Sequence, residues 1–131
     1  LYKKVARPYM IEPVFLTEHP IALSPLARAN DENKEITDRF QLVINGAEII
    51  NAYSELVDPQ EQERRLEEQA RLKANGDEEA MPMDYDYIGA MEYGMPPISG
   101  WGMGIDRLIQ LLTASENIKD VVLFPLMRPK E

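Results

Sequence analysis

The chain has 131 residues and a formal net charge of -9, from 14 lysine and arginine residues against 23 aspartate and glutamate residues, which argues against a broad surface for nucleic acid. Its length suits one domain, and the absence of cysteine excludes disulfide bonds and thiolate metal sites. No apolar run approaches the roughly 18 residues of a membrane span and the N-terminal segment lacks the apolar core of a signal peptide, so we expect a soluble, cytoplasmic protein.

The first half of the chain is expected to form β structure. Residues 10–17 predict a strand, and Pro13 places it at an edge or a bulge because proline cannot donate to a neighbouring strand. Residues 37–56 carry the clearest hairpin pattern of the chain. Asn45 and Gly46 lie there between two β-rich runs, and this pair suits a tight turn with positive φ.

A charged helix is expected after the hairpin. Asp58 offers an oxygen for the helix N-terminus, Pro59 suits the first helical position, and Gly76 marks the end. The interior carries charges on most faces and has pairs four residues apart, such as Glu61 with Arg65. This pattern predicts a solvated surface helix whose charges have no functional role.

The rest of the chain predicts more helices and one further strand. A helix is expected over residues 84–93, with Asp84 at its start and Gly94 at its end. The apolar run at 121–124 predicts a buried strand closed by Pro125. The order of elements indicates an α+β fold, with an antiparallel sheet and flanking helices.

Residues 98–113, ISGWGMGIDRLIQLLT, combine a glycine-rich strand with an amphipathic helix. Alternating glycines allow a ligand or another backbone to lie against the strand. The helix dipole favours Asp106 in the first turn and mildly opposes Arg107, so a cation there suggests an anionic partner such as a polyphosphate. A surface ion pair is the simpler alternative for an isolated arginine. The glycines are Gly100, Gly102 and Gly104, and the apolar face consists of Ile105, Leu108, Ile109 and Leu112.

The glycine spacing is GxGxG, not the GxGxxG of dinucleotide-binding folds, and no GxxxxGK[ST] motif occurs. The stretch resembles motif 3 of the class II aminoacyl-tRNA synthetases, in which a glycine-rich strand precedes a helix whose early arginine binds ATP. The match is closest to the lysyl enzymes. It continues through HPIALSPLAR at 19–28, RFQLVINGAEIINAYSELVDP at 39–59, GDEEAMPMD at 76–84 and VVLFPLMRP at 121–129. The resemblance implies that residues 1–131 are the C-terminal part of a synthetase catalytic domain, with motif 3 at about 98–113.

Three polar residues, Asn51, Tyr53 and Glu55, alternate along the second hairpin strand and therefore point to one face of it. Such a row needs either water or a ligand to satisfy it, and an ordinary exposed face is the plain alternative. The resemblance favours a lysine substrate, whose ammonium group would pair with Glu55 while Asn51 and Tyr53 supply hydrogen bonds. It also places Gly102 in the lysine site.

The resemblance implies that Glu48 helps to hold Mg²⁺ on the ATP phosphates. Strict alternation would put Glu48 and Asn51 on opposite faces, so we predict a β-bulge between them. The chain departs from the family at Gln41, where lysyl enzymes usually carry a second metal-binding glutamate; an amide oxygen brings no charge, so weaker metal binding is expected. The ATP-binding residues implied are Glu48, Ile49, Ile50, Asn51, Gly104, Ile105, Asp106 and Arg107, with Arg107 as the catalytic residue.

The function implied is that of a lysine–tRNA ligase, which uses ATP to convert lysine to lysyl-adenylate and transfers it to tRNA(Lys) as a homodimer. Motif 1, motif 2 with its arginine for the α-phosphate, and the anticodon-binding domain have no counterpart in these residues, so the chain alone is expected to be inactive. A paralogue that lysylates a protein and a non-catalytic, synthetase-derived binding module are the alternatives. Aspartyl and asparaginyl enzymes need a cationic side-chain pocket, which Glu55 opposes.

Overall fold

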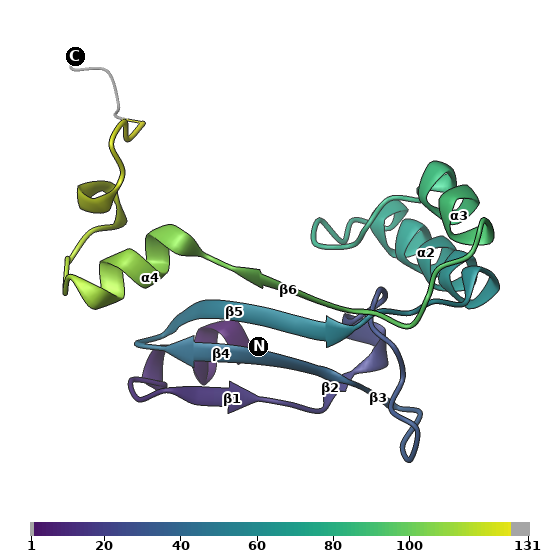
Figure 1. Ribbon diagram of the computed structural model, residues 1–131, viewed down its shortest axis with the longest axis horizontal. Coiled ribbons are helices and arrows are strands. Elements are labelled where there is room, and N and C mark those ends of the chain that lie inside the picture. Colours follow the sequence, from purple (N-terminus) through teal and green to yellow (C-terminus); the bar gives the residue numbers. More distant parts are fainter. Residues whose placement is uncertain (1, 127–131) are drawn as a thin grey trace. The chain divides into compact units, whose positions relative to one another are not determined.

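The computed structural model describes residues 2–126, and most of its strands and helices are labelled in Figure 1. The chain forms two compact units. One contains the residues up to Leu16, Gln41–Asn51 and the residues from Trp101 on; the other contains Thr17–Phe40 and Ala52–Gly100. The elements are α1 (Tyr2–Val5), β1 (Val14–Leu16), β2 (His19–Pro20), β3 (Ile36–Thr37), β4 (Arg39–Ile44), β5 (Ala47–Ser54), α2 (Pro59–Ala74), α3 (Tyr85–Glu92), β6 (Ser99–Met103) and α4 (Ile105–Leu112), with short 3-10 turns at Arg7–Tyr9, Ile21–Leu23 and Ile118–Val121.

The main sheet has the strand order β1-β4-β5-β6. β1 is antiparallel to β4, with Val14 opposite Val43. It is therefore an edge strand, which confirms the position predicted from Pro13. Val43 and Ile49 are the buried apolar residues of β4 and of the first half of β5, at 0% and 3% exposed.

The predicted hairpin is confirmed, and its register changes along its length. Asn45 and Gly46 have φ angles of 49° and 69°, the two-residue type I′ turn that suits the twist of paired strands. The register set by this turn would pair Ser54 with Thr37, whereas the Ser54 N–H donates to the Asp38 carbonyl at 2.9 Å. Between the turn and this hydrogen bond, the second arm of the hairpin thus contains one residue more than the first arm. One extra residue is what a β-bulge adds.

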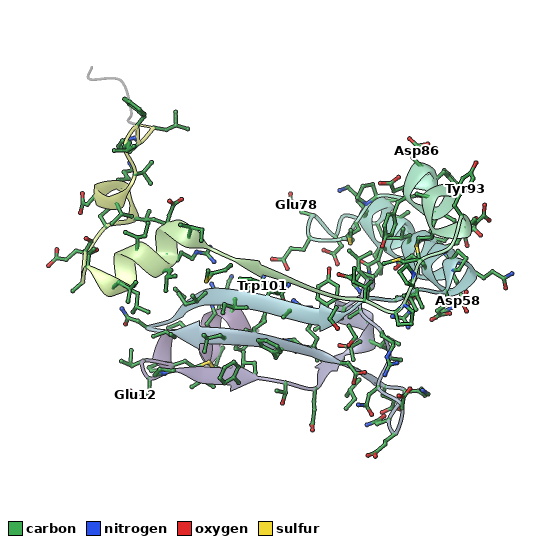
Figure 2. The ribbon with its side chains drawn as sticks, viewed as in Figure 1. Glu12, Asp58, Glu78, Asp86, Tyr93 and Trp101 are labelled. Carbon is green, nitrogen blue, oxygen red and sulfur yellow. The ribbon has the colours of Figure 1, made fainter. Side chains whose placement is uncertain are left out.

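Helices α2 and α3 begin and end where the sequence predicts. Asp58 accepts hydrogen bonds from the backbone at the start of α2, and Asp84 accepts one from the Tyr87 N–H at 2.9 Å at the start of α3. Gly76 and Gly94 follow the two helices with φ angles of 97° and 111°, which favour glycine. Figure 2 labels Asp58, at the start of α2, and Tyr93, at the end of α3.

Much of α2 is exposed, as the prediction of a solvated surface helix requires, but one face of it is buried. Leu66 is 1% exposed and packs with Ile88 and Met91 of α3. These residues form an apolar core in the unit that contains Ala52–Gly100. Arg65, the preceding residue, and Gln62, one turn earlier on the same face, are also buried. A helix with few apolar residues is buried along this face because long polar side chains can reach hydrogen-bond acceptors on a neighbouring segment.

The predicted strand at 121–124 is wrong. Val121 ends a 3-10 turn, and Leu123 and Phe124 are 91% and 90% exposed. An apolar strand needs a neighbour for its backbone, and no strand within 2–126 pairs with this run. Positions 127–129 of the matching stretch lie outside the described residues. No helix within the described part of the chain is both long and apolar enough to cross a membrane.

Candidate functional site

The junction between β6 and α4 brings Arg107 to the edge of β5. The Gly104 N–H donates to the Ile49 carbonyl at 3.0 Å, which fixes the end of β6 against β5. α4 begins at the next residue, and Arg107 Nη1 donates to the Glu48 carbonyl at 2.8 Å. A Cβ on Gly104 would lie 3.3 Å from the Arg107 Cδ, so glycine leaves room for this side chain. Four of the residues predicted to bind ATP therefore lie together.

The positive charge of Arg107 is not matched by a carboxylate within the described residues, where the side chain is exposed and makes no ion pair. The simpler interpretation of Arg107, a surface ion pair, is thus not what the structure contains in this region. A cavity of about 460 Å³ borders Arg107 and Ile49. Its wall comes mainly from the hairpin turn and the end of α4 and includes neither Glu48 nor Asn51, so it does not coincide with the predicted ATP site.

The two positions assigned to the metal, Gln41 and Glu48, are neighbours on β4 and β5. The Gln41 Nε2 donates to the Glu48 Oε2 at 2.7 Å, and both side chains are half-buried. A carboxylate and an amide oxygen fit a hard cation such as Mg²⁺, which keeps several waters and needs only one or two protein carboxylates. In this chain the Gln41 amide is neutral and donates its N–H to the Glu48 carboxylate. The pair therefore supplies a single negative charge. No cluster of three or more metal-ligating side chains occurs among residues 2–126.

The burial pattern of β5 supports the predicted bulge between Glu48 and Asn51. Ile49 and Ala52 are both buried, at 3% and 7% exposed, although residues three positions apart face opposite sides of a regular strand. Together with the register change along the hairpin, this phase shift is what a single extra residue produces. Such a bulge allows Glu48 and Asn51, both half-buried, to face the same side.

Glu55 follows β5 and is held by backbone contacts on both sides. It forms an antiparallel bridge with Ala27, and its N–H donates to the Ile98 carbonyl at 3.0 Å. Its carboxylate lies so close to Gly100 that a Cβ at that position would collide with Oε1. A cavity of about 320 Å³ beside Glu55 is lined by Arg28, Ser54, Val57, Pro97, Ile98 and Ser99.

The surroundings of Glu55 are electrostatically unusual. Burial raises the pKa of the Glu55 carboxyl above its ordinary value, because a half-buried charge loses hydration. Burial, and then the negative charge of Glu55, raise the pKa of Tyr53 and of Tyr87. The charge of Glu55 therefore influences both phenol groups. Together, Glu55, Tyr53 and Tyr87 form surroundings that suit a bound cation.

The remaining predicted residues lie on β5, on β6 and in the first turn of α4. Ile50 and Asn51 are half-buried on β5, whereas Ile105 and Asp106 are exposed in the first turn of α4. Gly102 is exposed, and a Cβ there would meet no atom within 4 Å, which leaves open space for a ligand on this part of β6.

The sequence matches a known family over nearly its whole length. The model of the family described as tRNA synthetases class II (D, K and N) matches residues 1–128. The chain belongs to this family. The antiparallel sheet with flanking helices confirms the predicted α+β fold of a class II synthetase domain.

Similar proteins include three curated lysine–tRNA ligases. The ligase of Enterobacter sp. (strain 638) is 54% identical over 129 residues, which cover 98% of this chain and 26% of the relative. The heat-inducible ligase of Escherichia coli is 53% identical over 131 residues, and that of Nitrosomonas europaea 54% over 131 residues; each match covers 100% of this chain and 26% of the relative. This synthetase chain thus spans about a quarter of the length of the relatives it matches.

Two residues near Glu55 were missed by sequence reasoning. Gly100 was recognised only as one of three alternating glycines, and the structure shows that its neighbour is the Glu55 side chain. Arg28 lies in a stretch that resembles the synthetases, but nothing in its spacing indicates a site. Arg28 borders the same cavity as Glu55 and pairs with Asp38 at 3.1 Å. Only the pairing of distant segments brings it there.

Proposed function

We propose that the intact protein is a lysine–tRNA ligase, which activates lysine with ATP and transfers it to tRNA(Lys). The observation that carries this proposal is the half-buried carboxylate of Glu55, which lies against Gly100 and acts on two tyrosines. An acidic side chain beside a cavity suits the ammonium group of lysine and opposes an acidic substrate. The identity of more than half of the residues to curated lysine–tRNA ligases supports the same substrate.

In the proposed reaction, a carboxylate oxygen of lysine attacks the α-phosphorus of ATP, the bond to the β-phosphate oxygen breaks, and pyrophosphate leaves. Catalysis of this kind depends on positioning and on charge stabilisation, and no side chain of this chain acts as a nucleophile. Arg107 would place its guanidinium against the phosphates, anchored by its hydrogen bond to the Glu48 carbonyl. Glu55, Tyr53 and Asn51 would hold the lysine.

The cofactors proposed are ATP and Mg²⁺. Glu48, with Gln41 beside it, would hold the ion, which when bound neutralises part of the charge of the phosphates. Because Gln41 replaces a carboxylate, we expect weaker metal binding than in a site with two glutamates. By family membership we also propose a cytoplasmic homodimer. Since the chain spans a quarter of its relatives, its residues should supply only part of the active site.

Lysine-dependent exchange of pyrophosphate into ATP, measured on the intact protein, tests the proposal. Glu55→Gln should raise the KM for lysine at least about a hundredfold, because it removes the charge that pairs with the ammonium group. Glu92→Gln, an exposed change on α3, is the matched control and should leave this KM unchanged. A normal KM for lysine in Glu55→Gln would refute the proposed pocket. Binding of neither lysine nor ATP by the unaltered protein would identify a non-catalytic module instead.

A further inference from the structure

Two buried polar side chains of α2 hold a loop that pairs with the end of β5. Gln62 is 0% exposed and Arg65 6%. The Gln62 Nε2 donates to the Pro25 carbonyl at 3.1 Å, and the Arg65 Nη1 donates to the Ala27 carbonyl at 2.9 Å. Both carbonyls belong to residues 24–28, which we name the α2-bound loop. The helix is thus attached to this loop by directed hydrogen bonds as well as by its apolar core.

The α2-bound loop forms backbone hydrogen bonds on both sides of Glu55. The Leu56 N–H donates to the Leu26 carbonyl at 2.9 Å, and the Arg28 N–H donates to the Ser54 carbonyl at 2.7 Å. Ala27 lies opposite Glu55 in the antiparallel bridge. The position of the Glu55 backbone, and with it the carboxylate, therefore depends on where α2 holds this loop.

Apolar side chains would attach α2 at lower cost than these polar ones. A buried guanidinium loses its hydration, and replacing buried ion pairs by apolar residues is often neutral or stabilising. Arg65 recovers part of this loss from Glu61, whose Oε1 lies 2.7 Å from its Nε. The Gln62 Oε1 is buried without a hydrogen-bond partner among the described residues, which is a further cost. What Gln62 and Arg65 add is the direction of their bonds to two particular carbonyls.

We infer that Arg65 and Gln62 are positioning residues for the amino-acid site, which act through the α2-bound loop on the place of the Glu55 carboxylate. The inference rests on the proposed function, in which Glu55 binds the lysine ammonium group. A displacement of about 1 Å in a binding or reacting group can lower activity by as much as about a hundredfold. Loss of either contact should thus weaken lysine binding specifically, without a matching effect on ATP.

The test compares Arg65→Gln with Arg64→Gln in the intact protein, by lysine-dependent pyrophosphate exchange and thermal unfolding. Arg64 also bonds Glu61, at 2.8 Å, but it is exposed and its side-chain hydrogen bonds go to Glu61, whereas Arg65 also bonds the Ala27 carbonyl, so Arg64 is a matched control for the ion pair alone. Arg65→Gln should raise the KM for lysine about tenfold or more, and the KM for ATP should stay within about twofold. Arg65→Lys should restore part of the lysine affinity, because lysine can still donate to the Ala27 carbonyl.

Gln62→Met is a second variant, for the case in which Arg65→Gln does not fold. It removes the bond to the Pro25 carbonyl together with the unpartnered Oε1, and it keeps an unbranched side chain in the buried position. A normal KM for lysine in a folded Arg65→Gln or Gln62→Met variant, or an equal rise in the KM values for lysine and ATP, would overturn the inference. An unaltered protein without lysine-dependent exchange would overturn the proposed function itself, and the inference with it.

Discussion

Gly100→Ala should weaken lysine binding while leaving the fold intact. The added Cβ would collide with the Glu55 Oε1 and lie 3.5 Å from its Cδ, so the carboxylate must move. Restoring ordinary van der Waals contact requires a displacement of about 1 Å at the end of a flexible side chain, which costs little stability but can reduce substrate binding by about a hundredfold. Gly100 does not have a positive φ, so alanine should even stabilise the protein by roughly 0.4–1 kcal/mol through the unfolded state.

The assay measures the KM for lysine and for ATP in the intact protein, together with the temperature of unfolding. Gly89→Ala is the matched control, because a Cβ at Gly89 would meet no atom within 4 Å. We expect a large rise in the KM for lysine for Gly100→Ala only, with little change in the KM for ATP. If Gly100→Ala folds and binds lysine with normal affinity, the contact between Gly100 and the Glu55 carboxylate does not shape the substrate site.

Three further predictions concern charge. Gln41→Glu should lower the Mg²⁺ concentration needed for half-maximal pyrophosphate exchange, since it adds a second carboxylate beside Glu48; an unchanged magnesium titration would show that position 41 does not ligate the ion. Arg107→Ala should reduce kcat/KM for ATP by roughly a hundredfold or more, whereas calorimetry should still detect lysine binding; equal losses for both substrates would instead indicate a folding defect. Hydrogen bonds from Arg64, and then from Arg65, lower the pKa of Glu61 from 4.5 to about 2, so the stabilisation that Glu61 provides is complete above pH 4.5 and is lost as the pH falls toward 2. The difference in unfolding temperature between the unaltered protein and Glu61→Gln should therefore shrink over that pH interval. A difference that does not change with pH would show that these ion pairs contribute nothing to stability.

Elements with local determinants were predicted from the sequence. The hairpin turn at Asn45 and Gly46 needs positive φ angles, and the side chains of Asp58 and Asp84 cap helices within their own segments. The strand and helix of motif 3 also lie where glycine alternation and helical spacing put them. These features involve residues a few positions apart, so the pattern contains the whole interaction.

The candidate site was predicted only in part, for the same reason. Tyr53 and Glu55 could be grouped by strand alternation, and Arg107 by its place in the first turn of a helix. The partner of Gly100 could not be found this way, because Glu55 is distant in sequence and only the pairing of β5 with the 98–100 segment brings the two together. The hydrogen bond between Gln41 and Glu48 likewise depends on which residues face each other across the hairpin.

Local signals in the sequence located the starts and ends of helices α2 and α3 and the hairpin turn, because capping, proline and glycine act over one or two turns of chain. The tertiary structure decided which faces are buried. Helical spacing made α2 a solvated helix, yet Gln62 and Arg65 are buried because a loop more than thirty residues earlier presents two carbonyls to them. Leu123 and Phe124 are apolar but exposed, since no described segment covers them. Burial is a relation between segments, and the spacing of residues within one segment does not contain it.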